Sequence, residues 1–303
     1  PLQMSSPTPS LSSTAYSAML DASLRATSVE PEPETRRCLL AVPKKGRLAA
    51  AILDILNGSG LDHVRPNRLD VAKCTSLPVS IVFLPASDIA RYVGEGDVDV
   101  GITGLDIIRE SQADVEVLHN LNMGKCKLAV QAPVGRFKSA SELAGLRIVT
   151  SFPNLSREYF GKLETPEGGK TDIKFVSGSV EVACALGLAD GIVDLVETGT
   201  TMRAAGLEMV GTVMKTETVI IKNPHTPNQP MVDRILKRIK GYLTAQTMSM
   251  MSYNIPRSVL PQATQITPGA NSPTISPLED EGWVSVTVMV KTEEISDVMD
   301  RLQ

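Results

Sequence analysis

The sequence predicts an α/β protein with two lobes, followed by a smaller α+β domain. Between Cys38 and Ile221, apolar runs of strand length alternate with segments of helical periodicity. Strand followed by helix, repeated, indicates parallel sheets covered on both faces. Beyond residue 226 the pattern changes to one long helix and then a β-α-β-β-α order, one strand short of a ferredoxin-like unit.

The first lobe is predicted from three apolar strands that alternate with helices. Cys38–Pro43 is the first strand, and apolar residues at helical spacing follow it up to Gly58 or Gly60. The other predicted strands of this lobe are Val79–Leu84 and residues 98–103. Short helices are expected at residues 88–93 and from Asp106.

The second lobe is predicted from the same alternation. Its strands are expected at residues 128–132, 148–150, 173–176 and 192–196, and a strand at 218–221 returns to the first lobe. Its helices are expected at residues 141–144, 155–163 and 180–188. In the last domain, a helix at 231–247 precedes strands at 248–253, 273–276 and 283–290 and helices at 257–263 and from Ile295. Valines alternate strictly along the strand at 283–290, which indicates one buried face.

The composition is that of an ordinary globular protein. Of 303 residues, 42% are hydrophobic and 21% are charged, and the formal net charge is -4. This charge argues against a general nucleic-acid binder, which is usually strongly basic. No apolar run is long enough to cross a bilayer, and the first residues contain no apolar signal-peptide core. We therefore expect a cytoplasmic protein without membrane or nucleic-acid partners.

Cysteine and histidine spacing gives no metal site. The chain has four cysteines without a C-x-x-C pair and three scattered histidines. Free thiols in a reducing cytosol are expected. Cys126 lies between Lys125 and Lys127, which can lower the pKa of a thiol, although a buried structural thiol is commoner. Three carboxylates can hold Mg²⁺ or simply cap turns, so metal ligands stay unassigned: Asp88, Asp97 and Asp99.

The strongest local signal is residues 194–201, Asp-Leu-Val-Glu-Thr-Gly-Thr-Thr. An apolar strand runs into a turn of hydroxyl residues around Gly199, and a helix is expected to start at 202. This order is typical of a phosphate site, because glycine lets the backbone approach the ligand and the helix start adds positive potential. Asp194 and Glu197 are placed to accept hydrogen bonds from ribose hydroxyls. A plain strand-turn-helix with a threonine N-cap is the alternative.

Two further loops follow predicted strands. Residues 43–47, Pro-Lys-Lys-Gly-Arg, can meet phosphates, Arg47 in a bidentate manner, or form a solvated basic turn. Residues 97–106 end in a turn at Thr103-Gly104 that lets a flat base approach the backbone, or forms a tight βα turn. Ligands of open α/β sheets lie beyond the carboxyl ends of the strands. The three loops together therefore predict a cleft for a phosphorylated ligand.

At these loops the sequence resembles ATP phosphoribosyltransferases of the long, self-regulated form, and the fungal enzymes most. The resemblance covers roughly residues 37–303. Each matching stretch is short, but their order and spacing are specific. They are residues 41–48, 68–70, 94–97, 101–104, 175–181, 194–202, 267–269 and 272–274.

The resemblance implies a periplasmic-binding-protein-like (type II) catalytic core and a C-terminal ferredoxin-like (ACT-like) regulatory domain. It implies a Mg²⁺-dependent reaction in which N1 of ATP attacks C1 of phosphoribosyl pyrophosphate. The products are 1-(5-phosphoribosyl)-ATP and pyrophosphate, in the first step of histidine biosynthesis. Histidine is the implied feedback inhibitor, and a dimer or hexamer is the implied assembly.

On this basis the chain divides into four parts. Residues 1–36, rich in Ser, Thr and Pro, form a disordered extension. Residues 37–126 and 208–225 form catalytic lobe I, and residues 127–207 form lobe II with the phosphoribosyl loop. Residues 226–303 form the regulatory domain, which lacks its last strand.

The resemblance also assigns site residues, position by position. The phosphoribosyl group is assigned to Asp194, Glu197, Thr198, Gly199, Thr200 and Thr201. ATP is assigned to Lys45, Arg47, Arg68, Gly104 and Asp106. Catalysis is assigned to Asp194, Glu181 and Lys45, and the histidine pocket to Asn254, Ala270 and Thr274. Asn254 stands where some relatives carry an acidic residue.

Other classes of protein share parts of the pattern. A two-lobed solute-binding or phosphosugar-binding protein without catalysis has the same fold. Such a protein would carry a secretory signal and would not need a threonine-rich phosphate loop. A phosphoribosyltransferase of the orotate type would show paired acidic residues directly before a T-G-G-T-like loop, in one domain. A regulatory or interaction protein would not need all three loops.

Overall fold

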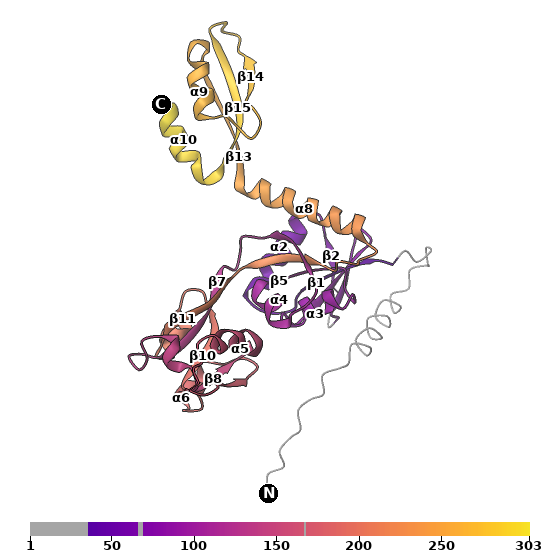
Figure 1. Ribbon diagram of the computed structural model, residues 1–303. Helices are drawn as coiled ribbons and strands as arrows, with labels where there is room; N and C mark the ends of the chain where they lie inside the picture. The colour runs from indigo at the N-terminus through magenta and orange to yellow at the C-terminus, as the bar shows by residue number, and fades with distance from the viewer. Residues whose placement is uncertain (1–35, 66–68, 167) are drawn as a thin grey trace. The chain divides into compact units, whose positions relative to one another are not determined.

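A computed structural model describes residues 36–65, 69–166 and 168–303. The extension predicted to be disordered lies outside these residues, apart from Arg36. The described chain forms sheets of seven, five and three strands (Figure 1). It divides into two compact units. The first contains the two larger sheets and extends to Asp233, while the second contains residues 55–60 and 234–303.

The seven-stranded sheet has the order β2-β3-β4-β1-β5-β12-β6. Its strands are β1 (Cys38–Pro43), β2 (His63–Val64), β3 (Val71–Cys74), β4 (Val79–Leu84), β5 (Val100–Gly104), β6 (Glu116–Asn120) and β12 (Thr218–Lys222). Its helices are α2 (Arg47–Gly58), α3 (Ile89–Gly94) and α4 (Leu105–Ser111). β1 pairs in parallel with β4 and β5, but the other pairings are antiparallel. The expectation of a parallel sheet is therefore correct for the centre and wrong for the edges.

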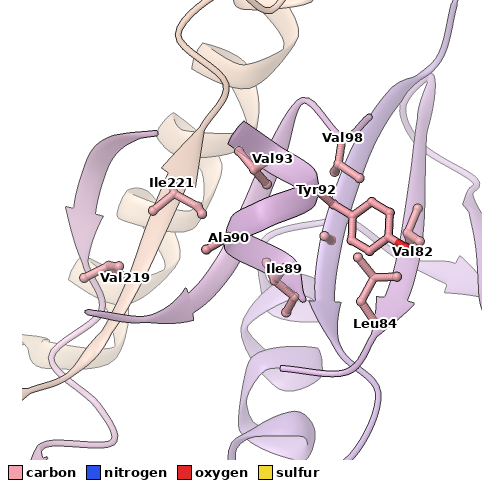
Figure 2. Packing of buried hydrophobic residues seen from close by; sticks show 10 residues of the cluster. Val82, Leu84, Ile89, Ala90, Tyr92, Val93, Val98, Val219 and Ile221 are labelled. Carbon is pink, nitrogen blue, oxygen red and sulfur yellow. The ribbon is translucent and has the colours of Figure 1, made fainter. Parts of the chain in front are cut away.

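Helix α3 packs directly against this sheet. Figure 2 shows Ile89, Ala90 and Val93 of α3 in one cluster with Val219 and Ile221 of β12. A Cβ atom at residue 101 would lie 2.8 Å from Ile89 Cγ2 and 2.9 Å from Val93 Cγ2. A glycine in β5 is thus needed for this close approach, because protein cores leave no room for an extra methyl group.

The five-stranded sheet has the order β11-β7-β10-β8-β9. Its strands are β7 (Cys126–Pro133), β8 (Arg147–Thr150), β9 (Asp172–Phe175), β10 (Gly191–Val196) and β11 (Leu207–Thr216). Its helices are η1 (Ala140–Leu143), α5 (Pro153–Gly161), α6 (Val182–Ala185) and α7 (Thr200–Ala204). β8 is parallel to β9 and β10, whereas β7 is antiparallel to β10 and β11. The chain enters this sheet by β7 and returns by β11 to the first sheet.

The second unit has the β-α-β-β-α order predicted for it. After α8 (Gln229–Thr247) come β13 (Met248–Pro256), η2 (Arg257–Val259), α9 (Leu260–Ile266), β14 (Thr274–Pro277), β15 (Trp283–Lys291), η3 (Thr292–Glu294) and α10 (Ile295–Leu302). The strands form an antiparallel sheet in the order β13-β15-β14. The alternating valines of β15 are buried on one face, as expected. The predicted absence of a last strand concerns residues beyond Gln303 and stays a prediction.

No helix among the described residues is long and apolar enough to cross a membrane.

A buried carboxylate fixes part of the first unit. Asp99, which is 1% exposed, accepts hydrogen bonds from Leu39 N (2.8 Å), Thr226 Oγ1 (2.6 Å) and Asn228 Nδ2 (3.1 Å). These contacts join β1 to the segment after β12. They engage both carboxylate oxygens, so Asp99 has a structural role here, and its holding a magnesium ion stays a prediction.

We predict that Asp99→Ala lowers the free energy of unfolding by about 3 kcal/mol, because three buried donors lose a charged acceptor. Urea unfolding followed by circular dichroism measures the change. Asp114→Ala removes an exposed carboxylate and should change stability by less than about 0.5 kcal/mol. Equal stabilities of the two variants would show that the Asp99 contacts contribute nothing.

Candidate functional site

The hydroxyl-rich loop forms the turn between β10 and α7. Gly199 occupies the N-cap position with a φ of +73°, a left-handed conformation that favours glycine. Gly199 has no side chain, and Thr200 N donates to Thr198 Oγ1 at 3.4 Å, so the threonine hydroxyl partly caps the first turn of α7. Thr198 Oγ1 lies 3.0 Å from Thr200 Oγ1, and Arg203 Nη2 donates to Thr198 O at 3.1 Å. The loop is thus held by α7 itself.

Two cavities of the first unit flank this loop and share Val196, Glu197, Thr198, Gly199 and Met202. The smaller, of about 180 Å³, is also lined by Arg47, Gln131, Glu181, Asp194, Leu195, Thr200 and Thr201. The larger, of about 540 Å³, is also lined by Leu105, Lys125, Cys126, Lys127, Arg203, Met209, Lys215, Thr216 and Glu217. The structure therefore brings all the predicted phosphoribosyl residues together.

Asp194 is the central acid of the smaller cavity. It lies near the end of β10, and its Oδ1 accepts a hydrogen bond from Leu195 N at 2.8 Å. Burial raises the pKa of Asp194 and the charge of Glu181 raises it further, while the Leu195 N–H lowers it. Asp194 and Glu181 therefore line one small cavity beside the Arg47–Glu197 ion pair. Such a place favours a cation or the hydroxyl groups of a sugar.

Arg47, at the start of α2, forms an ion pair with Glu197 of the loop. Both side chains are about half exposed, so the pair contributes orientation more than stability. Arg47 also hydrogen-bonds Cys126, which lowers the pKa of this thiol, but burial has the larger effect and the pKa is raised. Of the two readings of Cys126, the raised pKa favours the buried thiol over one activated by Lys125 and Lys127, because desolvation outweighs the nearby charges.

The basic loop after β1 has two kinds of lysine. Lys44 Nζ lies 2.6 Å from Asp70 Oδ2, and Arg65 Nη2 lies 3.3 Å from Asp70 Oδ1. Lys45 is exposed, makes no ion pair with the described residues and lines neither cavity. Arg68 lies outside the described residues. The predicted contacts of Lys45 and Arg68 with ATP stay predictions.

Gly104 and Asp106 lie where β5 meets α4. Thr216 Oγ1 donates to Asp106 Oδ1 at 2.6 Å and accepts from Asp106 N at 3.1 Å. A Cβ atom at residue 104 would lie 2.2 Å from Asp106 Oδ1, so only glycine fits. Leu105 lines the larger cavity, but Gly104 and Asp106 do not. The geometry makes Asp106 a link to β11, and its predicted contact with ATP stays a prediction.

The residues predicted to line the histidine pocket lie in the second unit. Asn254, Ala270 and Thr274 are all exposed. Asn254 pairs with Ser285 and Thr274 with Thr287, so both share the face of the sheet opposite the buried valines. β15 lies between them. Their role in binding histidine stays a prediction.

Sequence reasoning missed Gln131 and the basic residues of the larger cavity. Lys127 and Lys215 meet only because β7 and β11 are neighbours in a particular register. This pairing could not be predicted, because residues 207–216 were not recognised as a strand and local sequence does not specify strand register. Arg203 comes two residues after the phosphate loop in the sequence, so it could have been named as a candidate cation from the same motif.

These features define the class of protein. Two α/β sheets in one unit present a hydroxyl-rich turn with acids on one side and cations on the other. This arrangement is suited to a phosphorylated sugar, because the acids accept from hydroxyl groups and the cations meet phosphates. The class is therefore a two-lobed α/β protein with a site for phosphorylated ligands.

Comparison with known proteins identifies the family. Residues 85–241 match the family described as ATP phosphoribosyltransferase, and residues 245–303 match the HisG, C-terminal domain. The ATP phosphoribosyltransferase of Yarrowia lipolytica is 50% identical over 272 residues, which cover 88% of this chain and 91% of that protein. The Saccharomyces cerevisiae enzyme is 50% identical over 274 residues, with coverages of 89% and 92%.

A solved structure agrees with this result. The structure described as an "ATP phosphoribosyl transferase (HisG:HisZ) complex from Thermotoga maritima" aligns with a TM-score of 0.61 and 25% identity. The alignment covers 69% of this chain and 99% of that chain. The chain belongs to the ATP phosphoribosyltransferase family, and it is a pentosyltransferase. The predicted family and fold class are confirmed.

We predict that Gly199→Ala abolishes turnover while costing only about 1 kcal/mol of stability. An added Cβ would lie 2.8 Å from Arg203 Nη1, so the guanidinium that donates to Thr198 O must move, and the positive φ is strained for alanine. Gly206→Ala is the matched control, since Gly206 has a φ of +68° but no atom within 4 Å of the added Cβ. Steady-state kinetics and thermal unfolding of both variants separate the two effects. Equal activities would contradict a role of the loop geometry.

We predict that Asp194→Asn is more stable than the parent at neutral pH. The folded-state pKa of Asp194 is raised, so ionisation destabilises the fold as pH rises above the unfolded-state pKa of about 4. The stability difference should disappear below that pH. Asp190→Asn is the opposite case, because the hydrogen bond from Arg147 lowers the pKa of Asp190. That variant should lose about 1 kcal/mol at neutral pH. Thermal unfolding between pH 4 and pH 8 is the test, and a less stable Asp194→Asn at pH 7 contradicts it.

Proposed function

We propose that this protein transfers the phosphoribosyl group of phosphoribosyl pyrophosphate to N1 of ATP, with Mg²⁺, in the first step of histidine biosynthesis. The observation that carries the proposal is the loop at residues 198–201, flanked by acidic and basic cavities, in a member of this family. Under the proposal, this loop binds the 5-phosphate. Asp194 and Glu181 then face the ribose hydroxyls in the smaller cavity.

The reaction needs alignment more than acid-base chemistry. The N1–C1 bond forms as the C1–O bond to pyrophosphate breaks, and pyrophosphate leaves with the electron pair. The lone pair on adenine N1 is free, so no strong general base is required. The protein must hold two polyanions in line, and such positioning can supply about 7–11 kcal/mol of the barrier. Cations near the departing phosphates supply electrostatic stabilisation.

A magnesium ion fits the smaller cavity. The described residues contain no cluster of three His, Cys, Asp or Glu side chains for a protein-only metal site. Mg²⁺ commonly needs only one or two carboxylates beside substrate phosphates. Asp194 and Glu181 line one cavity and would supply them. When bound, the ion would neutralise the developing charge on pyrophosphate.

The remaining roles follow the family. Arg47, Lys45 and Arg68 contact the phosphates of ATP under the proposal, and Gly104 and Asp106 lie near its base. Histidine inhibits the enzyme through the second unit, at Asn254, Ala270 and Thr274. The enzyme works in the cytoplasm as a homo-oligomer, a dimer or a hexamer.

The direct test mixes the protein with ATP, phosphoribosyl pyrophosphate and Mg²⁺ and follows phosphoribosyl-ATP by its ultraviolet absorbance. Product should form only when all three are present. Added histidine should slow the reaction, whereas lysine or arginine should not. A folded protein that binds both substrates and yields no product would overturn the proposal.

We predict that Thr198→Ala combined with Thr201→Ala lowers kcat/KM for phosphoribosyl pyrophosphate by about 100-fold, because two hydroxyl donors to the phosphate are lost. The double variant should still unfold cooperatively, with a loss of stability of only about 1 kcal/mol, because Thr198 Oγ1 contacts Thr200 at the exposed start of α7. Thr244→Ala, on the exposed surface of α8, is the control and should leave the kinetics unchanged. Normal turnover by the double variant would remove the phosphate role of the loop.

A further inference from the structure

The larger cavity is more basic than its neighbour and carries no assigned ligand. Lys125, Lys127, Lys215 and Arg203 line it. Lys127 of β7 pairs in register with Lys215 of β11 and, on its other side, with Val196 at the end of β10. Register partners of antiparallel strands point to the same face. Two lysines are therefore held side by side at the base of the phosphate loop.

These lysines have no compensating partners in the described part of the chain. Among the described residues, the ammonium groups of Lys125, Lys127 and Lys215 form no ion pair and no hydrogen bond. Lysines elsewhere in the chain do form ion pairs, among them Lys44, Lys162, Lys174, Lys222 and Lys291. Like charges directly opposite each other in a sheet are destabilising. Lys125, Lys127 and Lys215 are exposed, so solvent screens the repulsion between Lys127 and Lys215, and their ammonium groups are accessible to a ligand.

The acidic residues of this cavity do not cancel the lysines. Glu197 forms its ion pair with Arg47. Glu217 Oε1 accepts a hydrogen bond from Asn120 Nδ2 at 3.0 Å, while its Oε2 is buried without a partner among the described residues. Arg203 donates to Thr198 O and so connects the cavity to the phosphate loop. Four cations against two carboxylates leave the cavity with positive charge.

We propose that Lys125, Lys127 and Lys215 bind the polyphosphate chain of a substrate, as a diphosphate or triphosphate. The cavity of about 540 Å³ has the size of a small-molecule site. Lysines act as mobile point charges on phosphate oxygens, which suits a chain that departs after reaction. The inference rests on the proposed function and deepens it. The chain bound is the pyrophosphate of the phosphoribosyl donor or the triphosphate of ATP.

The test measures binding without turnover. Isothermal titration calorimetry gives Kd for inorganic pyrophosphate, ATP and phosphoribosyl pyrophosphate, with the parent, Lys127→Met, Lys215→Met and the double variant. Each substitution should raise the Kd of the phosphate ligand about tenfold, which is the loss expected for one charge-assisted hydrogen bond. Lys138→Met is the matched control, since Lys138 is an exposed lysine in the loop that follows β7 and lines neither cavity.

The three ligands identify the source of the phosphate chain. If the variants bind pyrophosphate and phosphoribosyl pyrophosphate more weakly but ATP with unchanged affinity, the cavity holds the leaving group. If they bind ATP more weakly but phosphoribosyl pyrophosphate with unchanged affinity, the cavity holds the triphosphate. Affinities for all three ligands that equal those of Lys138→Met would overturn the proposal.

Two controls separate this proposal from others. The melting temperature of the ligand-free double variant should equal or exceed that of the parent, because a like-charge pair is removed. A large fall in that temperature together with unchanged affinities would assign the lysines a structural role and overturn the proposal. Turnover by the parent tests the proposed function independently. A parent that binds pyrophosphate through these lysines but forms no product would leave the cavity assigned and the reaction wrong.

Discussion

The antiparallel register of β7 with β10 and β11 determines where every part of the site lies. Because β7 starts where β10 and β11 end, Lys127 lies between Val196 and Lys215. The phosphate loop begins directly after Val196, so it emerges beside the two strands that lead to and from the first sheet. The hydrogen bonds between Thr216 and Asp106 then fix the end of β11 to the start of α4. A shift of this register would separate the loop from its cations.

The loop separates two cavities of opposite character. On one side, burial and the charge of Glu181 raise the pKa of Asp194, and these acids suit hydroxyl groups or a metal ion. On the other side, Lys127 and Lys215 suit phosphate oxygens. A phosphorylated sugar needs both surroundings, since its hydroxyl groups and phosphates differ in charge. In the smaller cavity, the buried charge of Asp194 opposes folding when no ligand is bound, as expected of a preorganised binding site.

The sequence predicted the fully buried strands with their bounds, and it missed β3, β6 and β11, which are only partly buried. Cys38–Pro43 and Val79–Leu84 have the predicted bounds, because strands covered on both faces appear as continuous apolar runs. Leu207–Thr216 was missed, because Gly211 and two register irregularities interrupt its alternation. The helix predicted at residues 180–188 is only Val182–Ala185 in the structure.

The candidate site was predictable to the same extent. The phosphate loop follows a buried strand within one local segment, so its residues could be identified from the sequence. The lysines of the larger cavity lie on strands far apart in the chain and depend on pairing that local sequence does not encode. The pKa of Cys126 could not be decided from its lysine neighbours alone, because the burial that raises it is set by the fold.

The most direct test of the account is a crystal structure of the protein with phosphoribosyl pyrophosphate and Mg²⁺. The account predicts the 5-phosphate within hydrogen-bonding distance of the backbone and hydroxyl groups of residues 198–201, with the ribose hydroxyls toward Asp194. A 5-phosphate bound instead at the basic loop of residues 44–47, with the threonine loop vacant, would contradict it.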